Sequence, residues 1–184
     1  PNIRFVAYSK LASELAYDAP EQKDEVTREL SRAFSAGKEP VASRVAIITT
    51  LGKLGRPGAR EAVLAAANDH DEPAIRAAGC RALGRVGKAE DWTVLARVMA
   101  ADPDLDCRVA AVEGLAKMRV EDQRLELMLV DGMEDPEPAI RLASLQALRS
   151  VSGQDLGVDP APWKKAAEDR MNAATAAKGV APKQ

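Results

Sequence analysis

The stretch IRAAGCRALGRVG, residues 75–87, decides the fold because close copies of it recur along the chain. Aligned on their arginine, four copies follow one another at spacings of 32, 32 and 33 residues, and a looser copy opens the chain at Arg4. A fixed period of this length is typical of proteins built from repeated helix pairs. The other three full copies are SRVAIITTLGKLG from Ser43, CRVAAVEGLAKMR from Cys107 and IRLASLQALRSVS from Ile140.

Each column of the alignment has a place on a helix. At 100° per residue from the arginine, positions −1, +3, +6, +7 and +10 fall within one arc of about 100°, which is the width of a buried apolar stripe. Positions +1, +5, +9 and +12 point the opposite way and are mostly polar. The recurring residues are arginine (Arg44, Arg76, Arg108, Arg141), alanine at +2 (Ala46, Ala78, Ala110, Ala143) and leucine at +7 (Leu51, Leu83, Leu115, Leu148).

A second set of amphipathic segments lies between these helices. Turns containing Asp-Pro, Glu-Pro or glycine separate the two sets, and we expect left-handed backbone at Gly55 and Gly87, which follow helix ends. A pair of antiparallel helices cannot bury its apolar stripe alone, so the pairs must stack. The sequence therefore predicts an all-α solenoid with no sheet. The first helices of the pairs are expected at about 21–35, 59–68, 90–101 and 121–134.

The unit resembles the short HEAT repeats named after phycobilisome lyases. Their signature V/I-R-x-x-A-x-x-A-L-G is matched by IRAAGCRALG from Ile75 and IRLASLQALR from Ile140. The resemblance implies a right-handed superhelix of HEAT-like, armadillo-type helix pairs over residues 1–153, with four to five pairs of which the first is partial. Residues 154–184 are expected to form a capping helix, sealed by Trp163, and a tail frayed from about Ala173.

The resemblance also implies a role for the arginine column. In this family the arginine usually reaches the acid in the turn before its own helix, which forms a ladder along the array. This predicts that Arg76 contacts Asp69 or Asp71, that Arg108 contacts Asp102, and that Arg141 contacts Asp135. The turn before Arg44 departs from the pattern, since it carries Gly37, Lys38 and Glu39.

Chemistry-bearing motifs are scarce. His70 is the single histidine, and it lies in a turn without a second base or metal ligand beside it in the sequence. Cys80 and Cys107 fall on the apolar side of their helices, where cysteine behaves as a small hydrophobe, and we expect free thiols. Gly-rich phosphate loops, nucleophile elbows and HExxH are absent. No catalytic residue, metal or cofactor is predicted, and we expect no enzyme.

The outward positions of the second helices gather positive charge, although the chain's net charge is only −2. At +5, +9 and +12 the three middle copies place six cations against one acid, Glu113. We expect these cations to line the concave face and the first helices to form an acidic back. Three interpretations of these cations are open. They keep the protein soluble and bind nothing, they bind an acidic partner in a basic groove, or they bind nucleic-acid backbone. The six cations are Lys53, Arg56, Arg81, Arg85, Lys88 and Lys117.

The expected function is a protein–protein interaction scaffold, with another protein, such as one bearing an acidic peptide segment, as its partner. Two alternatives are a subunit of a bilin lyase-type enzyme and a weak binder of nucleic-acid backbone. No apolar run approaches the roughly 20 residues that cross a bilayer. Because Arg4 falls in a second-type helix without a first helix before it, the chain is expected to be a monomeric piece of a longer protein. The compartment stays open, with the cytoplasm slightly favoured.

Overall fold

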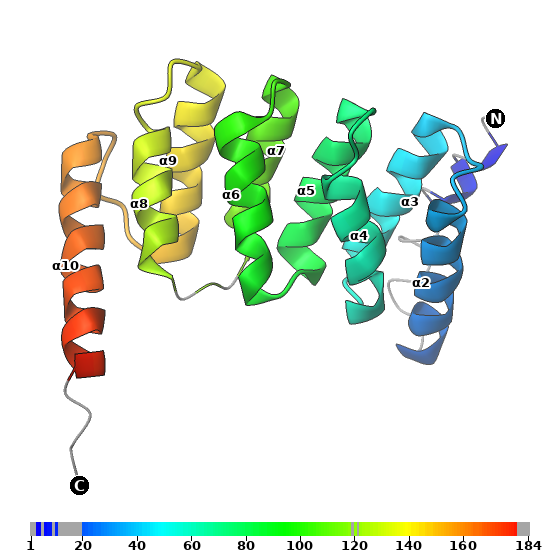
Figure 1. The fold of residues 1–184 in the computed structure, drawn as a ribbon, viewed down its shortest axis with the longest axis horizontal. Helices are drawn as coiled ribbons and strands as arrows, with labels where there is room; N and C mark the ends of the chain where they lie inside the picture. The colour runs from blue at the N-terminus through cyan, green and yellow to red at the C-terminus, as the bar shows by residue number, and fades with distance from the viewer. Residues whose placement is uncertain are drawn as a thin grey trace, which may run out of the picture. The chain divides into compact units, whose positions relative to one another are not determined.

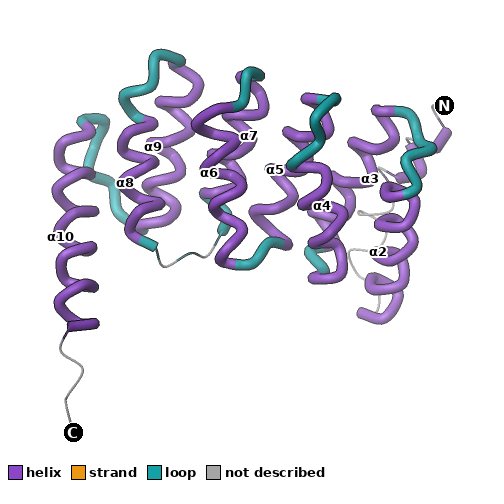
Figure 2. The backbone as a smooth tube through the Cα atoms, in the orientation of Figure 1, coloured by secondary structure: helices purple, strands orange, loops and turns teal. Residues whose placement is uncertain are grey.

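The computed structural model describes residues 3, 4, 6–8, 10, 20–118, 120 and 122–179. Within these residues the secondary structure is helical, without a strand (Figure 2). The chain forms two compact units, residues 1–118 and 119–184, each of which packs consecutive helices side by side. The all-α solenoid of adjacent helix pairs that the sequence predicts is confirmed.

Unit 1 contains three helix pairs whose members run antiparallel (Figure 1). In this view the first helices of the pairs stand in front and the second helices lie behind them. Short 3₁₀ turns at Pro57–Ala59 and Ala89–Asp91 lead into two of the first helices. The pairs are α2 (Pro20–Ser35) with α3 (Val41–Leu54), α4 (Arg60–Ala67) with α5 (Pro73–Val86), and α6 (Trp92–Ala101) with α7 (Leu105–Leu115).

The buried side chains of unit 1 follow the columns of the alignment. The three leucines at +7, Leu51, Leu83 and Leu115, are each 0% exposed. The alanine column is also buried, and Ala110 has no exposed surface at all. The phase assigned to the second helices from the sequence is therefore correct in this unit.

Helix α5 is the centre of unit 1 and packs against α3, α4 and α7. Its contact with α7 places Gly84 against Gly114, where a Cβ on either residue would collide with backbone of the other helix. Glycine at both positions therefore lets the two second helices approach more closely than larger residues would allow.

The ends of the second helices differ in detail from the sequence-based expectation. Gly55 has φ +65° and closes α3 in the left-handed conformation, as predicted. Gly87 has φ −69° and ψ 161°, so the prediction of left-handed backbone there is wrong. The chain leaves α5 in an extended conformation instead, and a Cβ at Gly87 would press against the Leu83 carbonyl oxygen.

Unit 2 contains α8 (Gln123–Gly132), α9 (Pro138–Ser152) and α10 (Pro160–Gly179), with α8 packed against both others. Trp163 on α10 is 1% exposed, and its Nε1–H donates to the Gly157 carbonyl over 2.9 Å. Helix α10 continues through Gly179, past the point near Ala173 where the sequence predicts a frayed tail. Alanine is the strongest helix former, and four of the seven residues from 173 to 179 are alanine.

The division between the units falls at residue 118, inside the segment 1–153 that the sequence treats as one repeat array. The expected cap, residues 154–184, belongs to the same compact unit as α8 and α9. None of the helices described in the structure combines the length and the apolar character needed to cross a membrane.

Candidate functional site

A cavity of about 230 Å³ lies on the second helices of unit 1, between α3 and α5. Four of the six cations predicted to share a face line it, namely Lys53, Arg81, Arg85 and Lys117. All four side chains are exposed. We name this cavity the basic groove. Its other lining residues are Val45, Thr49, Gly52, Ala74, Ala78 and Ala82.

Small residues form the floor of the basic groove. A Cβ added to Gly52 would lie 2.8 Å from the Ala82 Cβ, so α3 and α5 are in contact there. Ala78 and Ala82 are buried and present only methyl groups. The sequence-based reading took alanine at +2 as a packing residue and did not foresee the floor. Gly or Ala occupies position +2 in all four full copies, and positions +6 and +8 in three of the four, and this pattern could have indicated the floor.

The charge of the basic groove is strongly unbalanced. Arg81 donates from Nε to Glu113 over 2.6 Å, and the two side chains are 45% and 43% exposed. An exposed pair of this kind contributes little to stability and is screened by salt. Four cations beside one carboxylate leave a positive surface that favours an anionic ligand.

Arg56 and Lys88 do not line the basic groove. Arg56 donates from Nε and Nη2 to the carboxylate of Asp24 on α2, over 2.5 and 2.9 Å. Lys88 is exposed in the turn after α5. The cavity therefore brings together four of the six predicted cations and leaves these two outside its lining. Both lie at +12, beyond the last residue of their helix, where projection on a helical wheel no longer applies.

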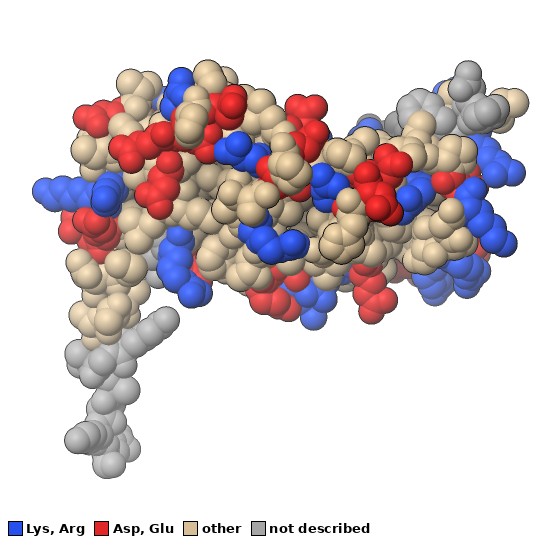
Figure 3. Space-filling model, turned by 45° about the horizontal axis from the view of Figure 1, so that its top comes forward, with Lys and Arg blue, Asp and Glu red and all other residues tan. Residues whose placement is uncertain are grey.

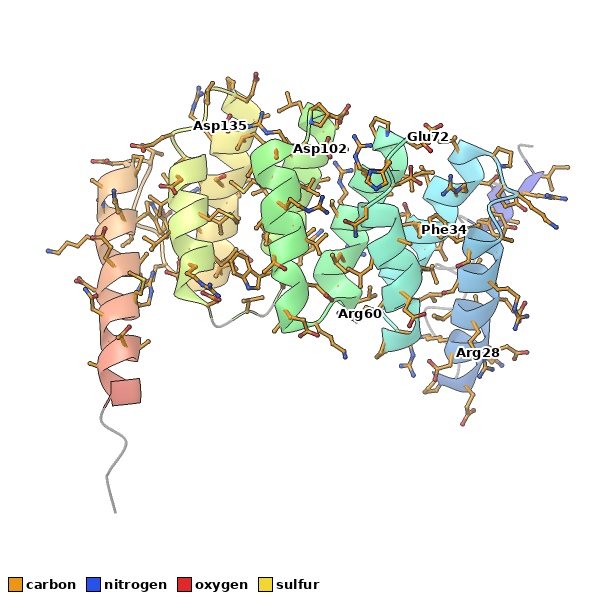
Figure 4. The ribbon with its side chains drawn as sticks, in the orientation of Figure 1. Arg28, Phe34, Arg60, Glu72, Asp102 and Asp135 are labelled. Carbon is orange, nitrogen blue, oxygen red and sulfur yellow. The ribbon has the colours of Figure 1, made fainter. Side chains whose placement is uncertain are left out.

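The expected acidic back is only partly present. Asp91 is 4% exposed and accepts two hydrogen bonds from Arg60, at 2.7 and 2.5 Å, so it belongs to the interior of unit 1. Figure 3 shows Lys and Arg interspersed with Asp and Glu over the face it presents. The first helices carry cations of their own, such as Arg28 and Arg60 (Figure 4). Glu121, which begins the first helix expected at 121–134, lies outside the described residues.

The arginine ladder exists in unit 1, but its direction differs from the prediction. Arg76 donates from Nε and Nη2 to the carboxylate of Asp102, over 2.9 and 3.1 Å. Asp102 lies in the turn after α6, the first helix of the next pair. The contact of Arg76 with the turn before its own helix is to a backbone carbonyl, that of Asp69, over 3.1 Å. Arg44 repeats this pattern, with a 3.0 Å ion pair to Asp69. Each rung therefore joins one helix pair to the next.

Arg108 and Arg141 donate to backbone carbonyls, where the sequence predicts contacts with the carboxylates of Asp102 and Asp135. The Asp102 carboxylate is taken by Arg76, and Arg108 donates from Nε to the carbonyl of Met99 over 3.2 Å. Arg141 donates to the backbone carbonyls of Asp135 and Pro136 over 2.8 Å each. The carboxylates of these turns also accept nearby backbone N–H groups, as Asp135 does from Glu137.

The ladder carboxylates have perturbed acidity. Burial raises the pKa of Asp102, but the hydrogen bonds from Arg76 and from the backbone N–H of Asp104 outweigh it, and the pKa lies below its usual value. The pKa of Asp69 is also lowered, because the backbone N–H groups of Glu72 and Asp71 and the charge of Arg44 outweigh its burial. Both groups are therefore held ionised at neutral pH.

The two cysteines and the histidine lie in different surroundings. Cys80 and Cys107 are free and buried, and burial raises the pKa of each thiol to about 12. His70 is exposed in its turn and lines a different cavity, of about 240 Å³, beside Arg97. Among the described residues, no cluster of three His, Cys, Asp or Glu side chains could hold a metal ion.

Comparison with known families matches part of the chain to HEAT repeats. The family model for HEAT repeats matches residues 30–116, which span most of unit 1 and all of the basic groove except Lys117. A search of curated proteins finds no matching relative.

Proposed function

We propose that this chain, a HEAT repeat protein, holds an acidic segment of a protein partner in the basic groove between α3 and α5. HEAT repeats are generally protein-interaction scaffolds, which supports the class of function. The observation that carries the finer proposal is the meeting of Lys53, Arg81, Arg85 and Lys117 around one cavity.

The physical basis of recognition is electrostatic complementarity. Cations on an exposed surface attract a segment of opposite charge, raise its association rate and disfavour basic competitors. Because the attraction is screened over about 8–10 Å at 0.10–0.15 M ionic strength, binding must weaken as salt rises. The uncharged floor of Gly52, Ala78 and Ala82 lets a chain lie close to the surface without placing a like charge beneath it.

The direct test is fluorescence anisotropy with a labelled ten-residue glutamate peptide. The groove variant carries Arg85→Glu and Lys117→Glu. The control variant carries Arg28→Glu and Lys38→Glu, which reverse two exposed charges outside the groove and change the net charge equally. We expect the groove variant to lose affinity by about tenfold or more, and the control by less than about twofold. Helical circular dichroism should be the same in both.

A third variant separates the groove from bulk charge. Glu113→Gln releases Arg81 from its ion pair, so binding of the glutamate peptide should tighten. Equal losses in the groove and control variants, or no binding by the parent protein, would overturn the proposal. Tighter binding of a DNA duplex than of the peptide, with the same dependence on Arg85 and Lys117, would move the function to nucleic-acid binding.

A further inference from the structure

The basic groove runs along the helices rather than across them. On α3 its lining residues Val45, Thr49 and Gly52 follow a helical i, i+4, i+7 row, and on α5 Ala74, Ala78 and Ala82 follow an i, i+4, i+8 row. Both rows continue to cations, at Lys53 and Arg85. At 1.5 Å per residue the groove is about 12 Å long on α3 and about 16 Å long on α5.

The two ends of the groove differ in chemistry. The end nearest the start of α3 and α5 is lined by Val45 and Ala74, which carry no charge. The end nearest the finish of these helices is lined by Lys53, Arg85 and Lys117. Arg81 lies between the two ends and is neutralised by Glu113. The positive charge available to a ligand is therefore concentrated at one end.

The length of the groove limits the segment that it can hold. An extended chain advances about 3.3 Å per residue, so four or five residues match the length of the groove.

We infer that the groove recognises an extended segment of four or five residues with small apolar side chains at one end and carboxylates at the other. This inference rests on the proposed function and adds the order of residues in the partner. The apolar end of the segment lies against Val45 and Ala74. Its carboxylates reach Lys53, Arg85 and Lys117, where they form charge-assisted hydrogen bonds.

The test compares labelled peptides of one composition. The first carries the block order Val-Ala-Val-Gly-Glu-Glu-Glu, the second the reverse order, and the third interleaves the same glutamates with the same apolar residues. The better of the two block peptides should bind about fivefold or more tightly than the interleaved peptide. A glutamate peptide of the same length measures the charge contribution alone.

A variant at the apolar end of the groove tests where the apolar end of the peptide lies. Ala74→Asn keeps an exposed position near the start of α5 and adds no charge. It should weaken the better block peptide by about threefold, the loss expected for one small apolar contact, and leave the glutamate peptide unchanged. Lys117→Gln should weaken all of the peptides.

The outcomes separate the two proposals. If block and interleaved peptides bind equally and both depend on Arg85 and Lys117, the order of residues is wrong while the acidic-segment function stands. If Ala74→Asn weakens the glutamate peptide as much as the block peptide, the inferred placement of the apolar end is wrong. If neither the block peptides nor the glutamate peptide binds, both proposals fail.

Discussion

Replacing Asp102 with asparagine tests whether the ladder between helix pairs stabilises unit 1. The Asp102 carboxylate accepts two hydrogen bonds from Arg76, and the two side chains are 6% and 12% exposed (Figure 4 labels Asp102). Asparagine has nearly the same shape and keeps an oxygen that can accept the N–H of Asp104. The change therefore removes the charge, and it replaces the oxygen that accepts from Arg76 Nε with an amide NH2 group, which cannot accept.

The expected cost follows from the two bonds to Arg76. Hydrogen bonds to charged groups contribute about 1.5–3 kcal/mol each, against about 0.5–1.5 kcal/mol for neutral ones. The loss is thus about 1 kcal/mol per bond, or about 2 kcal/mol in total. The guanidinium of Arg76 also keeps its charge without an opposite charge beside it, which costs further free energy. The figure of about 2 kcal/mol is therefore a lower bound on the loss of stability.

Urea denaturation followed by helical circular dichroism measures the effect, with equal m-values required of the variants compared. The matched control is Glu113→Gln, which removes the charge of a carboxylate bonded to Arg81, between the same two helix pairs, in an exposed ion pair. We expect the control to change the free energy of unfolding by less than about 1 kcal/mol. Equal and small losses in both variants would refute the reasoning that burial makes the ladder stabilising.

Three further predictions follow from the interior of the protein. Ala110→Leu should destabilise by about 1–3 kcal/mol in urea melts, since Ala110 is fully buried and extra methylenes have no room; a change within about 0.5 kcal/mol would show that the column is loosely packed. The folded-state pKa values of Asp69 and Asp102 lie below those of the unfolded chain. The two carboxylates therefore contribute fully to the free energy of unfolding above about pH 4, and this contribution is lost as the pH falls toward their folded pKa values. Asp102→Asn should make the free energy of unfolding fall less steeply in acid. Cys80 and Cys107, whose pKa values are raised to about 12, should react with a thiol reagent only on unfolding, and fast labelling of the native protein would contradict their burial.

The sequence predicted the interior of unit 1 well, because burial there repeats with the period of the chain. The columns that contain Leu83 and Ala110 fall on the same face of each second helix, and that face is buried in unit 1. The bounds expected for the first helices are close to those observed, as 59–68 is to α4 at Arg60–Ala67.

The direction of the ladder could not be read from the sequence. Arg76 lies near Asp69 in the chain and far from Asp102, and the repeat places an aspartate at both distances. Which carboxylate the guanidinium reaches depends on how neighbouring pairs stack. The turn acids are also committed to backbone N–H groups of their own turn, as Asp69 is to Asp71 and Glu72.

Four groove cations were found from the sequence because their positions project from a helix or from its continuation. Lys117 lies two residues beyond α7, where turn hydrogen bonds such as Lys117 N–H to the Gly114 carbonyl continue the helical path. Arg56 follows the left-handed Gly55, which turns the chain away, and Arg56 then meets Asp24. The floor of the groove was missed because closeness between α3 and α5 is a property of their packing.

The most direct measurement of the central claim is an NMR titration of the isotope-labelled chain with the glutamate peptide at low salt. Binding in the basic groove predicts that the largest amide shifts occur at its floor and basic end, in the residues around Gly52, Ala82 and Arg85. The shifts should shrink as salt is added. Shifts concentrated on α4 and α6, at the cavity beside His70, or spread evenly over the exposed cations would contradict the account.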